Sequence, residues 1–126
     1  MRFVLWIDDE PSRFSVLDGK LPANVCVVFA HGFDQINYYL RYSGINFSLV
    51  ILDHDMPAMS GTEVLAEFGE ELRFKNVFIC SENERAVGAM REQMGRIREE
   101  PLSMALLVTC PFSKDGFAAT ACLLLS

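Results

Sequence analysis

Short apolar runs alternate along the chain with longer segments that mix apolar and charged residues. The runs are rich in β-branched and aromatic side chains and are bounded by turn-forming or charged residues, which is typical of β-strands. They are continuously apolar rather than alternating, as strands are when a parallel sheet is covered on both faces. The predicted strands are Phe3–Ile7, Val25–Ala30, Leu49–Leu52, Val77–Cys80 and Ala105–Thr109.

The segments between these runs carry apolar residues at helical spacing, which predicts amphipathic helices with one face inward. Three such stripes are Phe33, Ile36 and Leu40; Val64, Leu65, Phe68 and Leu72; and Val87, Met90, Met94 and Ile97. A shorter and less regular helix is expected at Pro11–Lys20, and a mostly apolar last helix at Lys114–Leu125. Regular β-α alternation implies right-handed crossovers, so we predict an α/β fold. Its expected form is a flavodoxin-like, doubly wound three-layer sandwich with a five-stranded parallel sheet in the order 2-1-3-4-5.

Acidic residues follow two strands that this order makes neighbours. The first strand ends in Asp8-Asp9-Glu10 and the third ends in Asp53-His54-Asp55. Ligands of such sheets sit beyond the carboxyl ends of the strands, at the switch point between strands 1 and 3. Carboxylates gathered there repel one another unless they hold protons or bind a hard cation, and Mg²⁺ suits oxygen ligands best.

Length and charge narrow the function classes. The 126 residues suffice for one core, so we expect a single domain over 1–126. A net charge of −6 disfavours direct binding to nucleic acid. The first apolar run has only five residues and ends in acid, so we expect no signal peptide, no membrane span and a cytoplasmic protein. The four cysteines lack C-x-x-C spacing and are expected to be reduced.

Two segments carry a family resemblance that spans almost the whole chain. WIDDEP, followed after some forty residues by SLVILDHDMPAMSGTEVL, resembles the receiver domains of response regulators, the chemotaxis-regulator type. The matching positions are Asp8, Asp9, Asp53, Met56, Pro57 and Gly61.

The resemblance assigns roles to these positions. It implies that Asp8 and Asp9 hold Mg²⁺ and that Asp53 accepts a phosphoryl group. It also implies that Asp55 supplies a backbone carbonyl to the metal and that the Ser81 hydroxyl contacts the phosphoryl group. The expected protein is a stand-alone, non-enzymatic receiver in two-component phosphorelay signalling, which acts by binding a partner.

Its implied partners are a histidine kinase or phosphotransfer protein, or another protein. The apolar stretch Ala118–Leu125 exceeds the need of one packed helix face, so a homodimer is a further expectation.

The chain departs from the receiver pattern at the end of the fifth strand. Cys110-Pro111 replaces the family's lysine-proline pair, and a thiol supplies neither the positive charge nor the three donors of a lysine. Two interpretations stay open: a phosphorylatable regulator, and a pseudo-receiver that keeps the fold and the acids but has lost phosphorylation. The LDHD motif and the missing lysine are also similar to divergent receiver-like domains linked to cyclic-phosphate processing.

A second function class remains as an alternative. The motif Leu52-Asp53-His54-Asp55 is also similar to the nucleophile motif of the haloacid-dehalogenase superfamily. In such a Mg²⁺-dependent phosphohydrolase Asp53 would be the nucleophile and Asp55 the general acid. That motif usually lies on the first strand and needs a downstream lysine, so we rank this alternative second.

Overall fold

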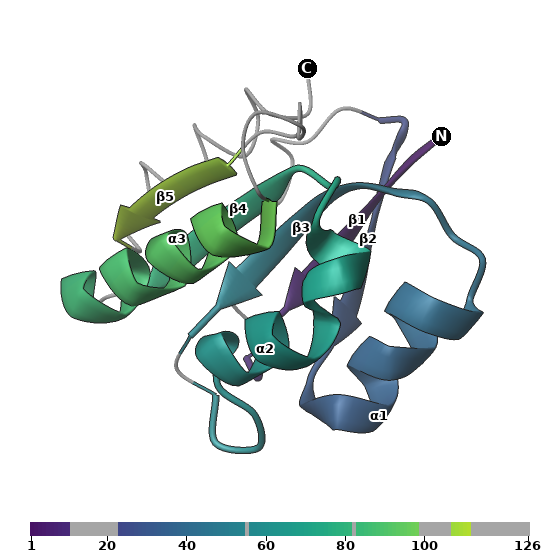
Figure 1. Cartoon of the computed structure of the whole chain (residues 1–126). Helices are drawn as coiled ribbons and strands as arrows, with labels where there is room; N and C mark the ends of the chain where they lie inside the picture. The colour runs from purple at the N-terminus through teal and green to yellow at the C-terminus, as the bar shows by residue number, and fades with distance from the viewer. Residues whose placement is uncertain (11–22, 55, 82, 99–106, 112–126) are drawn as a thin grey trace.

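A parallel sheet organises the described part of the molecule (Figure 1). The computed structural model describes residues 1–10, 23–54, 56–81, 83–98 and 107–111, and at Cys80, Arg98 and 107–111 it describes the backbone alone. Five strands pair in the order β2-β1-β3-β4-β5, which confirms the predicted topology. Their bounds are β1 Arg2–Ile7, β2 Val25–Ala30, β3 Phe47–Asp53, β4 Val77–Ser81 and β5 Leu107–Pro111.

Both faces of the sheet are buried, which explains why the strand sequences are continuously apolar. Successive side chains of a strand point to opposite faces. The side chains facing the helices are in one core cluster, which includes Leu5, Ile7, Val50, Leu52 and Ile79. The opposite face carries Val4, Trp6, Leu49, Ile51 and Phe78, each at most 1% exposed.

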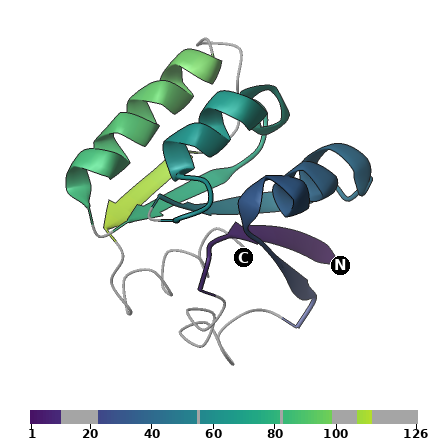
Figure 2. The same cartoon turned by 90° about the horizontal axis from the view of Figure 1, so that it is seen from below.

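Three α-helices cover one face of the sheet (Figure 2). They are α1 Gly32–Asn37, α2 Gly61–Leu72 and α3 Glu84–Arg98, and α1 runs on into a π-helical turn, η2 Tyr38–Tyr42. Their buried residues, which join the core cluster, are Ile36, Val64, Leu65, Phe68, Leu72, Met90 and Met94. The helices expected at Pro11–Lys20 and Lys114–Leu125 lie outside the described residues. None of the helices in the described part has the length and apolar character needed to span a bilayer.

The first turn of α2 is fixed by its cap and by the close approach of Gly61 to β3. The Ser60 side chain accepts a hydrogen bond from the backbone N–H of Glu63, whose side chain accepts one from the backbone of Ser60. This capping box defines where the helix begins. A Cβ atom at Gly61 would lie 2.9 Å from the Asp53 carbonyl oxygen and 2.9 Å from His54 Cα. The glycine thus allows α2 to begin directly against the end of β3.

The prediction that Phe33 faces the core was wrong. Its side chain is 45% exposed, whereas Ile36 on the same stripe is fully buried. Phe33 lies in the first turn of α1, where its ring contacts the Phe68 ring with centroids 5.6 Å apart. A helix that begins at Gly32 places this position at the rim of the core rather than within it.

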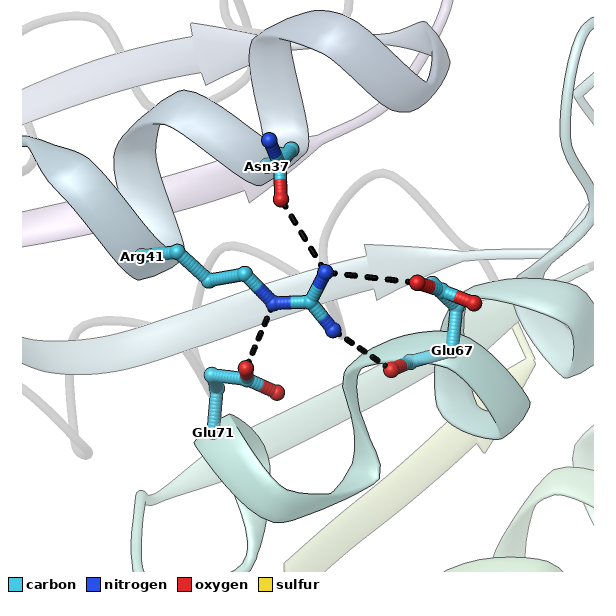
Figure 3. A network of polar contacts seen from close by, with 4 residues as sticks. All are labelled: Asn37, Arg41, Glu67 and Glu71. Atoms are coloured by element: carbon cyan, nitrogen blue, oxygen red, sulfur yellow. Dashed lines mark hydrogen bonds and ion pairs between the residues drawn. The ribbon is translucent and has the colours of Figure 1, made fainter.

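Arg41 joins the π-helical turn to α2 (Figure 3). Its guanidinium donates to the side chains of Asn37, Glu67 and Glu71 and to the Glu67 carbonyl oxygen, and it lies 4.5 Å from the centre of the Phe68 ring. The hydrogen bonds to Glu71 and Glu67 raise the pKa of Arg41 above its ordinary value, with Glu71 the larger influence, against an opposing effect of desolvation. The cation thereby packs over the ring of a buried core residue of α2.

Candidate functional site

The candidate site lies where the carboxyl ends of three adjacent strands meet. β3 pairs with β1 on one side and β4 on the other, and the pairing places Ile7 beside Leu52 and Asp53 beside Cys80. Asp8 directly follows β1, Asp53 is the last residue of β3, and Ser81 is the last residue of β4. The parallel arrangement therefore brings these polar residues to one edge of the sheet, as the topology predicted.

Three carboxylates cluster at this edge. Asp8, Asp9 and Asp53 each offer one oxygen, and these oxygens lie within 4.8 Å of one another. Asp8 and Asp53 are each only 1% exposed, and Asp9 is half-buried. Two unit charges at that separation repel by about 3.5 kcal/mol at an effective dielectric constant of about 20. This repulsion lowers the free energy of unfolding unless a cation or a proton neutralises the carboxylates.

Asp8 is held in place by its neighbours. Its backbone N–H donates to the Ala30 carbonyl oxygen at 3.1 Å and so extends the pairing of β1 with β2. Its Oδ1 accepts from the Glu10 backbone N–H at 2.9 Å, and its Oδ2 accepts from the Trp6 indole Nε1–H at 3.2 Å. The carboxylate is therefore oriented through both oxygens.

Asp9 provides the observation that tests whether the residues fit a metal ion. Its Oδ1 is buried and has no hydrogen-bond partner. Buried carboxylate oxygens without a partner are costly, and a cation is a partner that removes this cost. Ligands of an octahedral Mg²⁺ at about 2.0–2.1 Å lie roughly 3 to 4 Å from one another. The three oxygens need to move by less than about 1 Å to reach that spacing, so the donor set fits Mg²⁺.

Ser81 ends β4 with its hydroxyl turned toward the chain that follows. The residue is 1% exposed, and its Oγ accepts a hydrogen bond from the Asn83 backbone N–H at 3.1 Å. The Asn83 side-chain oxygen in turn accepts from the backbone N–H groups of Arg85 and Ala86, at 3.0 and 3.2 Å. Asn83 thus caps α3, and the short link fixes Ser81 relative to the start of that helix.

The turn after β3 is tightly packed against the same edge. The His54 carbonyl oxygen accepts from the backbone N–H groups of Met56 and Gly61, at 2.9 and 3.2 Å. Met56 is buried with 7% exposure, and His54 is half-buried with an Nδ1 atom that has no hydrogen-bond partner. Met56 and Gly61, both singled out from the sequence, therefore hold the start and the end of the connection between β3 and α2 against His54.

Two predicted site positions are not described in full. Asp55 falls outside the described residues, and Cys110 is described by its backbone alone, which pairs with that of Cys80 across β4 and β5. The one lysine among the described residues, Lys75, precedes β4 and lies at the opposite edge of the sheet. Within the described part of the chain, no lysine lies at the carboxyl edge of the sheet, where Cys110 stands at the lysine position of the receiver pattern.

Sequence reasoning missed the role of Trp6. The sequence pattern marks Trp6 only as an apolar residue of the first strand, yet its indole N–H donates to Asp8. The signal was present in the sequence, because residues two apart on a strand share a face. A tryptophan two positions before a strand-end aspartate places a hydrogen-bond donor on the carboxylate's side.

Comparison with known proteins supports the fold. No family model and no curated protein matches this sequence. Among solved structures, the response regulator TrrA from Thermotoga maritima in complex with Mg²⁺-BeF is 21% identical, with 99% of this chain and 100% of that chain covered and a TM-score of 0.65.

Two further structures are similar to a comparable degree. TrrA in complex with the histidine kinase ThkA matches at 22% identity over 100% of both chains, with a TM-score of 0.60. The chemotaxis protein CheY4 from Vibrio cholerae matches at 20% identity over 99% of both chains, with a TM-score of 0.62. The chain therefore has the fold of response regulator receiver domains.

Proposed function

We propose that this chain is a receiver domain that binds Mg²⁺ through Asp8, Asp9 and Asp53 and accepts a phosphoryl group on Asp53. The observation that carries the proposal is the cluster of three carboxylates at the joint of β1 and β3, with a buried, unpartnered oxygen on Asp9. The structure of TrrA with Mg²⁺-BeF supports it, because a protein of the same fold binds this ion.

The residues support an in-line phosphoryl transfer. A carboxylate oxygen of Asp53 would attack the phosphorus of a donor, forming a new O–P bond while the donor's own bond to phosphorus breaks and the donor leaves with that electron pair. Bound Mg²⁺ would supply positive charge that offsets the charge on the phosphoryl oxygens. Asp53 is almost fully buried and lies at the end of a central strand, whose last residue pairs with Cys80 of β4.

The remaining roles follow from the same arrangement. Ser81 is the proposed contact of the phosphoryl group, because its buried hydroxyl ends the strand next to Asp53. We assign to Asp55 a backbone carbonyl ligand for the metal. The proposed donor is a histidine kinase or phosphotransfer protein, which the complex of TrrA with the kinase ThkA supports. Output would come from binding to a further protein or to a second copy of the chain.

A second candidate rests on Cys110. A thiol at this position cannot pair with Asp53 or with a phosphoryl group as a lysine ammonium does. The chain would then be a pseudo-receiver, which keeps the metal-binding acids and binds its partner without phosphorylation.

The first experiment separates these two candidates. The protein is incubated with acetyl phosphate, with and without Mg²⁺, and its intact mass is measured. A Mg²⁺-dependent gain of one phosphoryl group that is absent from Asp53→Asn supports the working receiver. Mg²⁺ binding in calorimetry without any gain in mass supports the pseudo-receiver.

A turnover assay covers the phosphohydrolase alternative. The protein is incubated with a chromogenic phosphate ester and Mg²⁺, and the released chromophore is compared with the amount of protein. A receiver holds at most one phosphoryl group per molecule at a time, so a short assay should release no more than about one equivalent of chromophore. Release of many equivalents that disappears in Asp53→Asn would replace the receiver proposal with the phosphohydrolase.

A further inference from the structure

The tryptophan of β1 donates a hydrogen bond to a carboxylate of the candidate metal site. Trp6 is the single tryptophan of the chain and is fully buried. Its indole Nε1–H donates to Asp8 Oδ2 at 3.2 Å, between two residues on the same face of one strand. The hydrogen bond therefore joins the sheet interior to one of the three clustered carboxylates.

The packing of the indole holds this donor in place. In the sheet Trp6 lies between Phe29 of β2 and Ile51 of β3. The rings of Trp6 and Phe29 are 5.5 Å apart with an interplanar angle of 31°, and Ile51 is fully buried. A buried ring flanked on both sides by close-packed neighbours cannot change its rotamer without disturbing them. The direction of the N–H bond is thus set by the fold.

The donor acts on a carboxylate whose other oxygen is also fixed. Asp8 Oδ1 accepts from the Glu10 backbone N–H at 2.9 Å. Each carboxylate oxygen can accept more than one interaction, so both can still bind a cation while these bonds persist. Hydrogen bonds from neighbouring residues to a ligating carboxylate orient it, and their loss typically costs about 10- to 100-fold in metal affinity.

We propose that Trp6 is a positioning residue, whose indole N–H fixes the Asp8 carboxylate in the orientation in which it joins Asp9 and Asp53 around a divalent cation. The inference rests on the proposed function and deepens it. Phenylalanine or leucine would fill the same space in the sheet but would leave Asp8 Oδ2 without this donor. The indole N–H also becomes a direct reporter of the site, because a cation that binds Asp8 withdraws electron density from the oxygen to which the N–H donates.

The test removes the indole N–H of Trp6 and keeps a bicyclic ring of the same size in its place. Because Trp6 is the single tryptophan, growth of a tryptophan auxotroph on 3-benzothienylalanine substitutes this position alone and exchanges the indole N–H for sulfur. Isothermal titration with MgCl₂ should show affinity weakened by about 10-fold or more relative to the natural protein. Trp6→Phe should give a similar loss. Leu72→Val, which alters the core on the other face of the sheet and leaves the neighbours of Trp6 unchanged, should stay within about 3-fold of the natural protein.

A spectroscopic measurement separates positioning from packing. In ¹⁵N-labelled protein the indole N–H gives one resonance, which should shift on addition of Mg²⁺ and stay in place in Asp9→Asn at the same Mg²⁺ concentration. Equal Mg²⁺ affinity of the natural and benzothienyl proteins would overturn the inference and leave the proposed metal site in place. An indole resonance whose chemical shift does not change when Mg²⁺ binds would do the same. Absence of Mg²⁺ binding by the natural protein would overturn both proposals. A failure of phosphorylation with these shifts present would remove only the phosphoacceptor.

Discussion

Replacement of Asp9 by asparagine should stabilise the protein in the absence of metal. Asp9 is nearly isosteric with asparagine, and its oxygen lies within 4.8 Å of oxygens of Asp8 and Asp53. At that separation each charge pair contributes about 0.9 kcal/mol of repulsion in bulk water and about 3.5 kcal/mol at an effective dielectric constant of about 20. Asp9 is half-buried, so we expect Asp9→Asn to raise the free energy of unfolding by about 1 to 3 kcal/mol in EDTA.

Magnesium should offset this difference in stability. A ligand that binds only the folded state at about 100 times its Kd adds about 2.7 kcal/mol. The natural protein should gain this amount, whereas Asp9→Asn, which lacks one ligand, should gain much less. The measurement is urea unfolding of both proteins in EDTA and in saturating Mg²⁺, followed by circular dichroism.

The matched control is Glu70→Gln, which removes an exposed carboxylate on α2. It should change the free energy of unfolding by less than about 0.5 kcal/mol in either condition. The reasoning fails if Asp9→Asn is less stable than the natural protein in EDTA, or if Mg²⁺ stabilises both proteins equally.

Three further predictions concern other parts of the fold. Gly61→Ala should lower the free energy of unfolding by about 1 to 3 kcal/mol in urea, because the added Cβ would meet backbone atoms. Gly88→Ala in α3, which has open space around it, should raise the free energy of unfolding by about 0.5 to 1 kcal/mol. Equal effects of the two substitutions would refute the argument. Arg41→Met should lower the melting temperature and Arg41→Lys should not restore it, because a lysine cannot reach Glu67 and Glu71 together; full rescue would count against the network. Burial lowers the pKa of Lys75 below 10.5, so the folded state sheds this proton before the unfolded state does. The resulting penalty is present at neutral pH and is relieved as the pH rises through the lowered value toward 10.5, and Lys75→Gln should lack this relative gain in melting temperature.

The sheet could be predicted from the sequence because its strands carry an unambiguous local pattern. Val25–Ala30 was predicted with the bounds that the structure shows, and the other strands differ by a residue or two at their ends. The strand order followed from the alternation of elements and from the handedness of crossovers. The positions of Asp8 and Asp53 at one edge then followed from the order alone, without any knowledge of side-chain geometry.

The details that escaped prediction depend on contacts between distant segments. Phe33 has the right spacing for a core position, yet α1 begins too close to it for the ring to reach the interior. Arg41 looks like a surface residue until the π-helical turn brings it over the Phe68 ring of α2. The bond from Trp6 to Asp8 was accessible in principle, because it needs only strand alternation. The roles of Asp55, Ser81 and Cys110 in phosphoryl transfer stay predictions.

The acidic cluster also has a consequence for the kinetics of folding. Asp8 and Asp9 follow β1, whereas Asp53 ends β3, more than forty residues later in the chain, so the cluster exists only after these two strands have paired. A cation held there would contact both central strands, and the site that binds it is lost when these strands separate. If the strand ends come together after the rate-limiting step, Mg²⁺ would leave the refolding arm of a chevron plot unchanged and slow the unfolding arm. The bound ion would then lengthen the lifetime of the native sheet by lowering its unfolding rate.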